Sequence, residues 1–119
     1  MDIKIEPRLL NGKVKIPPSK SVSHRVLISA ALASGTSEIK GIMNSKDIIA
    51  TTECLKAMGA NITEHDGVAQ ITGISSVSEN VILDCCESGS TLRFLIPVAG
   101  ALGINATFIG KGRLPERPI

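Results

Sequence analysis

The sequence predicts an α/β (α+β) domain built from short β-α-β-α-β-β units, of which about one and a half are present. Glycine and proline divide the 119 residues into short segments. Within these segments, apolar residues recur either at every second position or at helical spacing, and the order of segments restarts near Val81. A repeat unit leaves an apolar face that a neighbour normally covers. A repeat that stops part-way therefore indicates a piece of a larger fold.

The first unit is expected to contain seven elements. In order, these are strands Asp2–Glu6 and Lys13–Ile16, helix Ser19–Ser34, strand Ser37–Ile42, helix Lys46–Met58, and strands Ile62–His65 and Val68–Thr72. Gly35 and Gly59 are expected to end the two helices, Ser45 to cap the second one, and Asp66-Gly67 to form a two-residue hairpin turn. The predicted apolar helix faces are Val22, Val26, Leu27, Ala30 and Ala31 in the first helix, and Ile48, Ile49, Leu55 and Met58 in the second.

The second unit is expected to be shorter. It contains strand Val81–Asp84, a helix from Ser90 to Leu102 that Pro97 kinks or interrupts, and strand Ala106–Ile109. A basic, loop-like tail follows.

Composition excludes several classes of partner. The net charge of +2 and an aromatic content of 2% disfavour nucleic acid and membrane surfaces as partners. There is no apolar run long enough to span a bilayer and no signal-peptide pattern at the start. Three cysteines without C-x-x-C spacing indicate neither disulfides nor a metal site, and favour a cytoplasmic setting. His24 and His65 are interpreted as structural or exposed residues.

Segment 17–25, Pro-Pro-Ser-Lys-Ser-Val-Ser-His-Arg, combines a helix start with two cations. The unpaired N–H groups and the dipole of a helix N-terminus favour phosphate or carboxylate. Lys20 adds a mobile point charge, Ser21 a small hydroxyl, and Arg25 a planar fork one turn later. The alternative, for such a segment taken alone, is that Ser19 and Ser21 are ordinary caps and that Lys20 and Arg25 are solvated.

Segment 87–93, Glu-Ser-Gly-Ser-Thr-Leu-Arg, repeats this design. Gly89 permits close approach of a ligand to the backbone, Ser90 supplies a hydroxyl, and Arg93 supplies a cation. Taken alone, an ordinary capped helix is the better interpretation. Asp47, in the first turn of the helix between these segments, is interpreted as a partner of the helix dipole rather than a catalyst.

The tail, residues 110–118, carries Lys111, Arg113 and Arg117 on a chain made loop-like by glycine and proline. Alone, it is typical of a solvated surface loop. Together, however, segments 17–25, 87–93 and 110–118 hold six of the thirteen lysines and arginines. We therefore expect the three segments to converge on one doubly anionic ligand.

These three segments are similar to motifs of the enolpyruvyl transferase family. The resemblance lies in Pro18-Ser19-Lys20-Ser21-x-Ser23-x-Arg25, Ser88-Gly89-Ser90-Thr91-x-Arg93 and Arg113-x-x-Glu116-Arg117-Pro118-Ile119, in this order and over nearly the whole chain. The first motif resembles the shikimate-phosphate branch rather than the UDP-N-acetylglucosamine branch. Ser90 departs from the threonine that relatives often carry, and Glu87 from the asparagine of some relatives, which alters the local charge.

The resemblance implies an inside-out α/β prism and transfer of an enolpyruvyl group from phosphoenolpyruvate to the 5-hydroxyl of shikimate 3-phosphate, without metal or cofactor. It implies that Lys20, Ser21 and Arg25 bind shikimate 3-phosphate, and that Gly89 and Arg113 bind phosphoenolpyruvate, where glyphosate also binds in relatives. Ser90, Arg93 and Arg117 are weaker candidates. In domain terms, the resemblance implies that residues 1–17 are opening strands near the hinge to the missing other domain, and that residues 18–119 are part of the amino-terminal substrate-binding domain. The general acid and base, and the rest of the enzyme as a partner, are expected in sequence that this chain does not contain. No catalytic residue is therefore assigned, and we expect no turnover from this piece alone.

Two other interpretations remain open at this stage. One is a stand-alone module that binds small anions without catalysis. The other is a purely structural β-α repeat unit with ordinary helix caps. Only the enzyme interpretation accounts for all three motifs together, and the reading frame beyond Ile119 would separate it from the others.

Overall fold

A computed structural model describes all residues, 1–119, and shows three helices and five strands after an extended start. The elements are α1 (Lys20–Leu32), β1 (Thr36–Lys40), α2 (Lys46–Ala57), β2 (Asn61–His65), β3 (Val68–Thr72), β4 (Asn80–Asp84), α3 (Gly89–Ala101), β5 (Asn105–Ile109) and the 3₁₀ turn η1 (Leu114–Glu116). Every helix and strand from α1 onward lies within two residues of its predicted bounds. These boundaries were predictable because local caps and turn residues set them.

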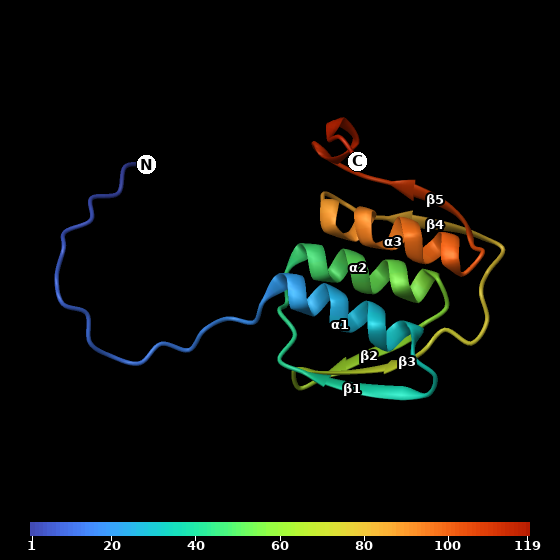
Figure 1. The fold of residues 1–119 in the computed structure, drawn as a ribbon, viewed down its shortest axis with the longest axis horizontal. Helices are drawn as coiled ribbons and strands as arrows, with labels where there is room; N and C mark the ends of the chain where they lie inside the picture. The colour runs from blue at the N-terminus through green and yellow to red at the C-terminus, as the bar shows by residue number, and fades with distance from the viewer.

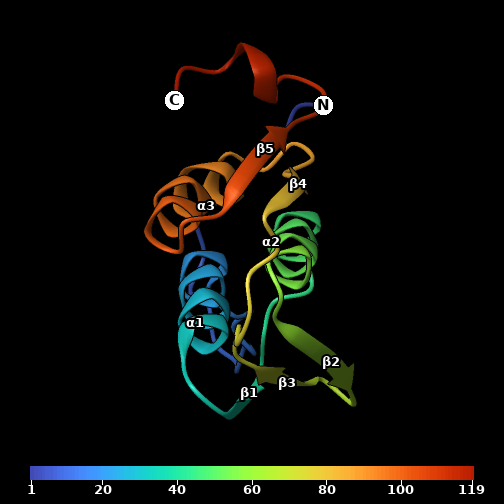
Figure 2. The same cartoon turned by 90° about the vertical axis from the view of Figure 1, so that its right-hand side faces the viewer.

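The helices lie between two sheets. Figure 1 shows α1, α2 and α3 side by side and running in the same direction, with β1–β3 on one side and β4–β5 on the other. Figure 2 shows the same layers from the side, with α1 and α2 above the three-stranded sheet and α3 next to β5. This arrangement, with helices inside and sheets outside, is the predicted inside-out α/β architecture, of which the chain contains a part.

The two sheets differ in strand direction. The first is antiparallel in the order β1-β3-β2, with β2 and β3 joined by Asp66-Gly67. Both turn residues have positive φ, 51° and 73°, which confirms the predicted two-residue hairpin. The second sheet pairs β4 and β5 in parallel, with α3 as the crossover between them. Because a parallel pair needs such a crossover, the start of α3 follows the carboxyl end of β4 directly.

The core is continuous between helices and sheets. Fully buried side chains come from every layer; the largest apolar ones are Leu27, Leu55, Met58, Ile71, Leu83 and Leu95. Because one core joins the two repeat units, the start of α3 is held in a defined position relative to the starts of α1 and α2. No helix is long and apolar enough to cross a membrane.

The predicted strands Asp2–Glu6 and Lys13–Ile16 do not form. Residues 1–19 contain no helix or strand, and their side chains are exposed, including Ile3, Ile5 and Ile16. Figure 1 shows this segment leading away from the helices. The alternating pattern is that of a strand, but a strand also needs a neighbour to receive its N–H and C=O groups. No segment of this chain takes that place.

Parts of the predicted apolar helix faces are also wrong. Val22 is 56% exposed and Ile49 is 51% exposed, while Ser23 and His24 of α1 are buried. Helix α1 therefore turns a partly polar face toward α2, a choice that apolar spacing cannot reveal. Helix α3 is continuous through Pro97, so of the predicted kink or interruption the interruption does not occur. Pro97 is exposed, so the carbonyl that it leaves without a donor can be solvated.

Candidate functional site

The first turns of the three helices lie at one end of the molecule (Figure 1). Each has a serine N-cap whose hydroxyl accepts a backbone N–H three residues later: Ser19, Ser45 and Ser88. A capped helix still has further N–H groups without a partner, and these groups and the dipole attract anions. The cap of α3 is thus Ser88, and Ser90, which was expected to open this helix, lies inside its first turn. The arrangement places three anion-attracting helix starts side by side.

Lys20 lies in the first turn of α1 and forms an ion pair with Asp47. Its Nζ is 2.6 Å from Asp47 Oδ2, in the first turn of α2. The predicted position of Asp47 at a helix start is confirmed, but its contact with Lys20 was not predicted. The signal for it was available, because consecutive helices of a β-α repeat run parallel and begin at the same end. Both side chains are partly exposed, so Lys20 remains able to meet a ligand.

Arg25 is held by α1 and by α3. Its Nη1 donates to the carbonyl of Ser21, 2.9 Å away, and its Cζ lies 5.0 Å from the centre of the Phe94 ring. This cation–π contact fixes the guanidinium plane over a residue of α3. Arg25 has no carboxylate partner among the ion pairs of the structure, so its remaining N–H groups are free for an oxyanion.

Gly89 is the first residue of α3, and neither its backbone nor its neighbours require a glycine. Its φ is outside the left-handed region. A Cβ there would lie 3.7 Å from Arg117 Nη1 and 3.9 Å from Leu114 Cδ1, which are ordinary van der Waals distances. The contacts within this chain therefore leave room for a side chain at this position.

The basic tail folds back onto the start of α3. Leu114 is buried, and Arg93 Nη2 donates to the carbonyl of Pro118, 2.8 Å away. Gly112 has φ +55°, a backbone conformation that favours glycine, where the tail crosses the flexible end of the Glu87 side chain. A cavity of about 50 Å³ lies between the start of α3 and the tail.

The predicted cation cluster is only partly assembled. Lys111 is paired with Asp84, its Nζ 2.8 Å from Oδ2. This contact raises the pKa of Lys111, and together with the N–H of Cys86 it lowers the pKa of Asp84. Arg113 and Arg117 are exposed and have no ion pair. Of the three cations of the tail, the two arginines thus have no carboxylate partner, whereas Lys111 is paired in the same way as Lys20.

Arg25 of segment 17–25 thus contacts Phe94, the residue that follows segment 87–93, and Arg93 of segment 87–93 holds the tail through the carbonyl of Pro118. The side chain of Arg113, although at the same end, contacts none of the other candidates through a hydrogen bond or ion pair. Phe94 was not singled out from the sequence. An aromatic residue directly after the Gly89 motif, in a chain with so few aromatic residues, was the signal that could have identified it.

The remaining titratable residues lie apart from these helix starts or inside the core. His65 is exposed in the hairpin, whereas His24 is fully buried. Burial lowers the pKa of His24, an effect that nearby Asp47 partly opposes and Lys20 and Arg25 increase. Cys54 and Cys85 are buried, as small hydrophobes commonly are, and Cys86 is partly exposed. No group of three or more His, Cys, Asp or Glu side chains is placed to hold a metal ion.

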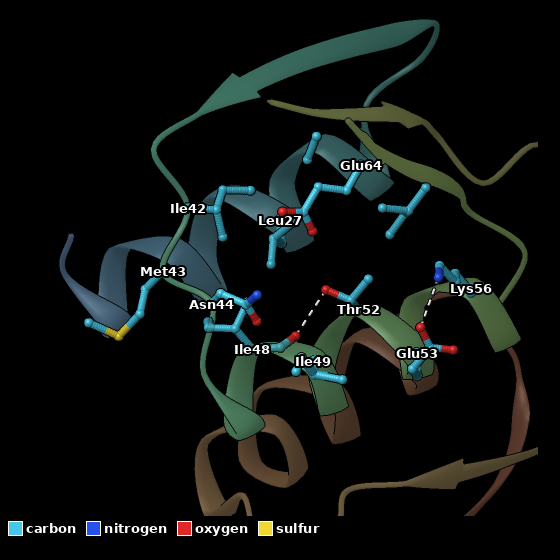
Figure 3. Close-up of a pocket in the computed structure, with 12 residues that line it drawn as sticks. Leu27, Ile42, Met43, Asn44, Ile48, Ile49, Thr52, Glu53, Lys56 and Glu64 are labelled. Atoms are coloured by element: carbon cyan, nitrogen blue, oxygen red, sulfur yellow. Dashed lines mark hydrogen bonds and ion pairs between the residues drawn. The ribbon is translucent and has the colours of Figure 1, made fainter. Parts of the chain in front are cut away.

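A separate cavity lies between α1, α2 and the three-stranded sheet. It has a volume of about 140 Å³ and is lined mainly by apolar side chains, among them Leu27, Ile42 and Ile48 (Figure 3). Glu53 and Lys56, which pair with each other at 2.8 Å, lie at one side of it. None of the predicted anion-binding residues lines this cavity, so it is distinct from the helix starts described above.

Comparison with known proteins identifies what these motifs belong to. The sequence model of the family EPSP synthase (3-phosphoshikimate 1-carboxyvinyltransferase) matches residues 5–119. The chain is 46% identical over 127 residues to a 3-phosphoshikimate 1-carboxyvinyltransferase of Clostridium beijerinckii, and 49% identical over 118 residues to one of Clostridium kluyveri. The two alignments include 99% and 98% of this chain, but only 29% and 28% of the relatives' lengths.

A solved structure shows the same fold. EPSP synthase from Acinetobacter baumannii superimposes with a TM-score of 0.73 at 29% identity, covering 90% of this chain and 25% of that one. The family match, the curated relatives and the structural likeness agree with the three motifs and the inside-out architecture. The chain therefore belongs to the EPSP synthase (3-phosphoshikimate 1-carboxyvinyltransferase) family and spans somewhat more than a quarter of the length of the curated relatives it matches.

Proposed function

We propose that this chain is the amino-terminal substrate-binding part of a cytoplasmic 3-phosphoshikimate 1-carboxyvinyltransferase. The whole enzyme would transfer the enolpyruvyl group of phosphoenolpyruvate to the 5-hydroxyl of shikimate 3-phosphate. In this reaction the hydroxyl oxygen adds to C2 of phosphoenolpyruvate while C3 takes a proton, and phosphate then leaves as C3 gives a proton up. The product belongs to the route to chorismate and the aromatic amino acids.

The observation that carries the proposal is the shared location of the helix starts and their cations. Arg25 of α1 stacks on Phe94 of α3, and neither Arg25 nor Arg113 is neutralised by a carboxylate. Two anionic substrates bound at one end of the molecule would meet fixed positive charge from both repeat units. Orientation of two reactants is itself a large contribution to rate, and preorganised charge adds to it.

The assignment of residues follows the motifs. Lys20, Ser21 and Arg25 would bind shikimate 3-phosphate at the start of α1, where Lys20 can exchange Asp47 for the phosphate. Gly89 and Arg113 would bind phosphoenolpyruvate at the start of α3. The open space around Gly89 supports this assignment, because no contact within this chain requires a glycine there.

Three residues are proposed in supporting positions. Ser90 lies in the first turn of α3, and Arg93 holds the tail through the carbonyl of Pro118. Arg117 lies beside Gly89. The general acid and base would come from the rest of the enzyme, as would the neighbour for residues 1–17, which we propose lie near the hinge between two domains.

The test measures binding of shikimate 3-phosphate by NMR chemical shifts. It compares two variants that serve as a matched pair. Lys20→Ala removes the cation of the proposed site, and Lys56→Ala removes an equally exposed lysine whose partner, Glu53, is 2.8 Å away. A charge-assisted hydrogen bond contributes about 1.5–3 kcal/mol, so Lys20→Ala should weaken binding about 10- to 150-fold. Lys56→Ala should leave binding unchanged.

Turnover completes the test. The full-length protein should release phosphate from phosphoenolpyruvate only when shikimate 3-phosphate is present, and this chain alone should release none. Shifts that avoid residues 20–25, equal effects of the two lysine variants, or a full-length protein without this activity would each contradict the proposal.

A further inference from the structure

A line of buried polar side chains connects the three helices. His24 of α1, Thr51 of α2 and Thr91 of α3 are each 0% exposed. His24 Nδ1 is 2.8 Å from Thr51 Oγ1, which is 2.8 Å from Thr91 Oγ1. Thr91 Oγ1 in turn lies 2.7 Å from Ser88 Oγ and 3.3 Å from the carbonyl oxygen of Asp47. We call this hydrogen-bonded line the relay; it ends at the first turns of α2 and α3.

The direction of these hydrogen bonds follows from counting protons. A threonine hydroxyl carries one proton. The Asp47 carbonyl can only accept, so Thr91 gives its one proton there, and Thr91 Oγ1 accepts in its contacts with Thr51 and with the Ser88 hydroxyl. Thr51 then donates its only hydroxyl proton to Thr91, so Thr51 Oγ1 must accept a hydrogen bond from His24. His24 Nδ1 is therefore the donor, and the neutral ring carries its proton on Nδ1.

The other ring nitrogen agrees with this assignment. His24 Nε2 is buried and has no hydrogen-bond partner. With the proton on Nδ1, Nε2 is a lone pair beside apolar groups, Phe94 among them, whose ring centre lies 6.0 Å from that of His24. The opposite tautomer would bury an N–H without an acceptor and would also break the line at Thr51. Both consequences are unfavourable.

We propose that His24 is a positioning residue, which acts through Thr51 and Thr91 to hold the first turns of α1 and α3 at a fixed separation. This inference rests on the proposed function, because those turns carry the two proposed substrate sites. A second contact, the ion pair between Lys20 and Asp47, joins the starts of α1 and α2. An apolar side chain could fill the same volume, but it would not select this one arrangement of the three helices.

The first experiment reads the tautomer directly, in the full-length protein without ligand. Two-bond ¹H–¹⁵N correlation spectra distinguish a protonated from a bare ring nitrogen, and His24→Asn assigns the signals. We expect a protonated Nδ1 and a bare Nε2 at neutral pH. A bare Nδ1 with a protonated Nε2 overturns the relay, whatever any variant does.

The second experiment compares two variants in steady-state turnover of phosphoenolpyruvate and shikimate 3-phosphate. His24→Asn places an amide N–H where Nδ1–H lies, whereas His24→Leu fills the space without a donor. Loss of alignment should appear in kcat more than in KM, by about 10-fold or more for His24→Leu, with both KM values within about 3-fold of wild type. His24→Asn should recover most of kcat.

The outcomes separate the inference from the function on which it rests. Equal losses of kcat in the two variants, or losses confined to KM, overturn the positioning role. If the wild-type protein itself does not turn over these substrates, the proposed function fails, and the tautomer still decides whether the relay exists. Thr51→Val in the His24→Leu background should add little further loss, since the relay is already broken, and an additive loss counts against a single relay.

Discussion

Replacement of Gly89 by alanine separates a ligand role from a fold role. In this chain the new methyl group would meet only ordinary contacts, 3.7 Å from Arg117 Nη1 and 3.9 Å from Leu114 Cδ1. The backbone φ is one that alanine accepts. Because alanine also loses less conformational entropy on folding than glycine, the free energy of unfolding should be unchanged or rise by up to about 1 kcal/mol.

Binding of phosphoenolpyruvate should change in the opposite sense. If the ligand approaches the backbone at Gly89, the methyl group occupies space that the ligand needs. An extra methyl in a filled site typically costs about 1–3 kcal/mol, which corresponds to roughly 5- to 150-fold in affinity. The variant would thus be as stable as wild type or more so, and would bind more weakly.

Gly100→Ala is the matched control. Gly100 lies in the last turn of the same helix, and a Cβ there meets nothing within 4 Å. It should show a similar or larger gain in stability with no change in affinity. Urea unfolding followed by circular dichroism measures the first quantity, and calorimetric titration of the full-length protein measures the second. Wild-type affinity in Gly89→Ala, or a loss of stability above about 1 kcal/mol, would refute the reasoning.

Two further predictions concern the fold. Gly73→Ala would place its Cβ 1.8 Å from the carbonyl oxygen of Ala33, so the backbone must shift; an overpacked site typically costs about 1–3 kcal/mol, and urea unfolding that showed no loss would contradict this contact. His24 has a lowered pKa because of burial, with Asp47 opposing the effect and Lys20 and Arg25 adding to it. As the pH falls below about 6.5, the unfolded chain binds a proton that the folded chain resists, so the unfolding free energy should decrease by at most about 1.4 kcal/mol per pH unit. Denaturation curves from about pH 7.5 to about pH 5 should show this dependence of the unfolding free energy on pH in wild type and in His65→Asn. The dependence should be weaker in His24→Asn. An unchanged dependence in His24→Asn would assign the effect to other groups.

Local signals in the sequence determined where the helices and most strands begin and end. Ser45 caps α2 as expected, Ser19 caps α1 one residue before the helix begins, and Asp66-Gly67 forms the hairpin. These features depend on residues close together in the chain, so they need no knowledge of the neighbours. The same applies to the anion-binding character of the first turns, because it arises from the helix ends themselves.

Contacts between distant residues were decided only by the tertiary structure. The alternating start of the chain carries a strand pattern, but pairing requires a partner strand, and none is within reach in this chain. Apolar spacing placed Val22 in the core, whereas α1 buries Ser23 and His24 instead.

The reason for that reversal is the relay itself. Burying His24 is favourable because its ring N–H donates a hydrogen bond to Thr51 of α2, whose hydroxyl in turn donates to Thr91 of α3. The three residues are separated by 27 and 40 positions along the chain. No local pattern records such a match, since each side chain is unremarkable alone and satisfied only when the other helices are in place.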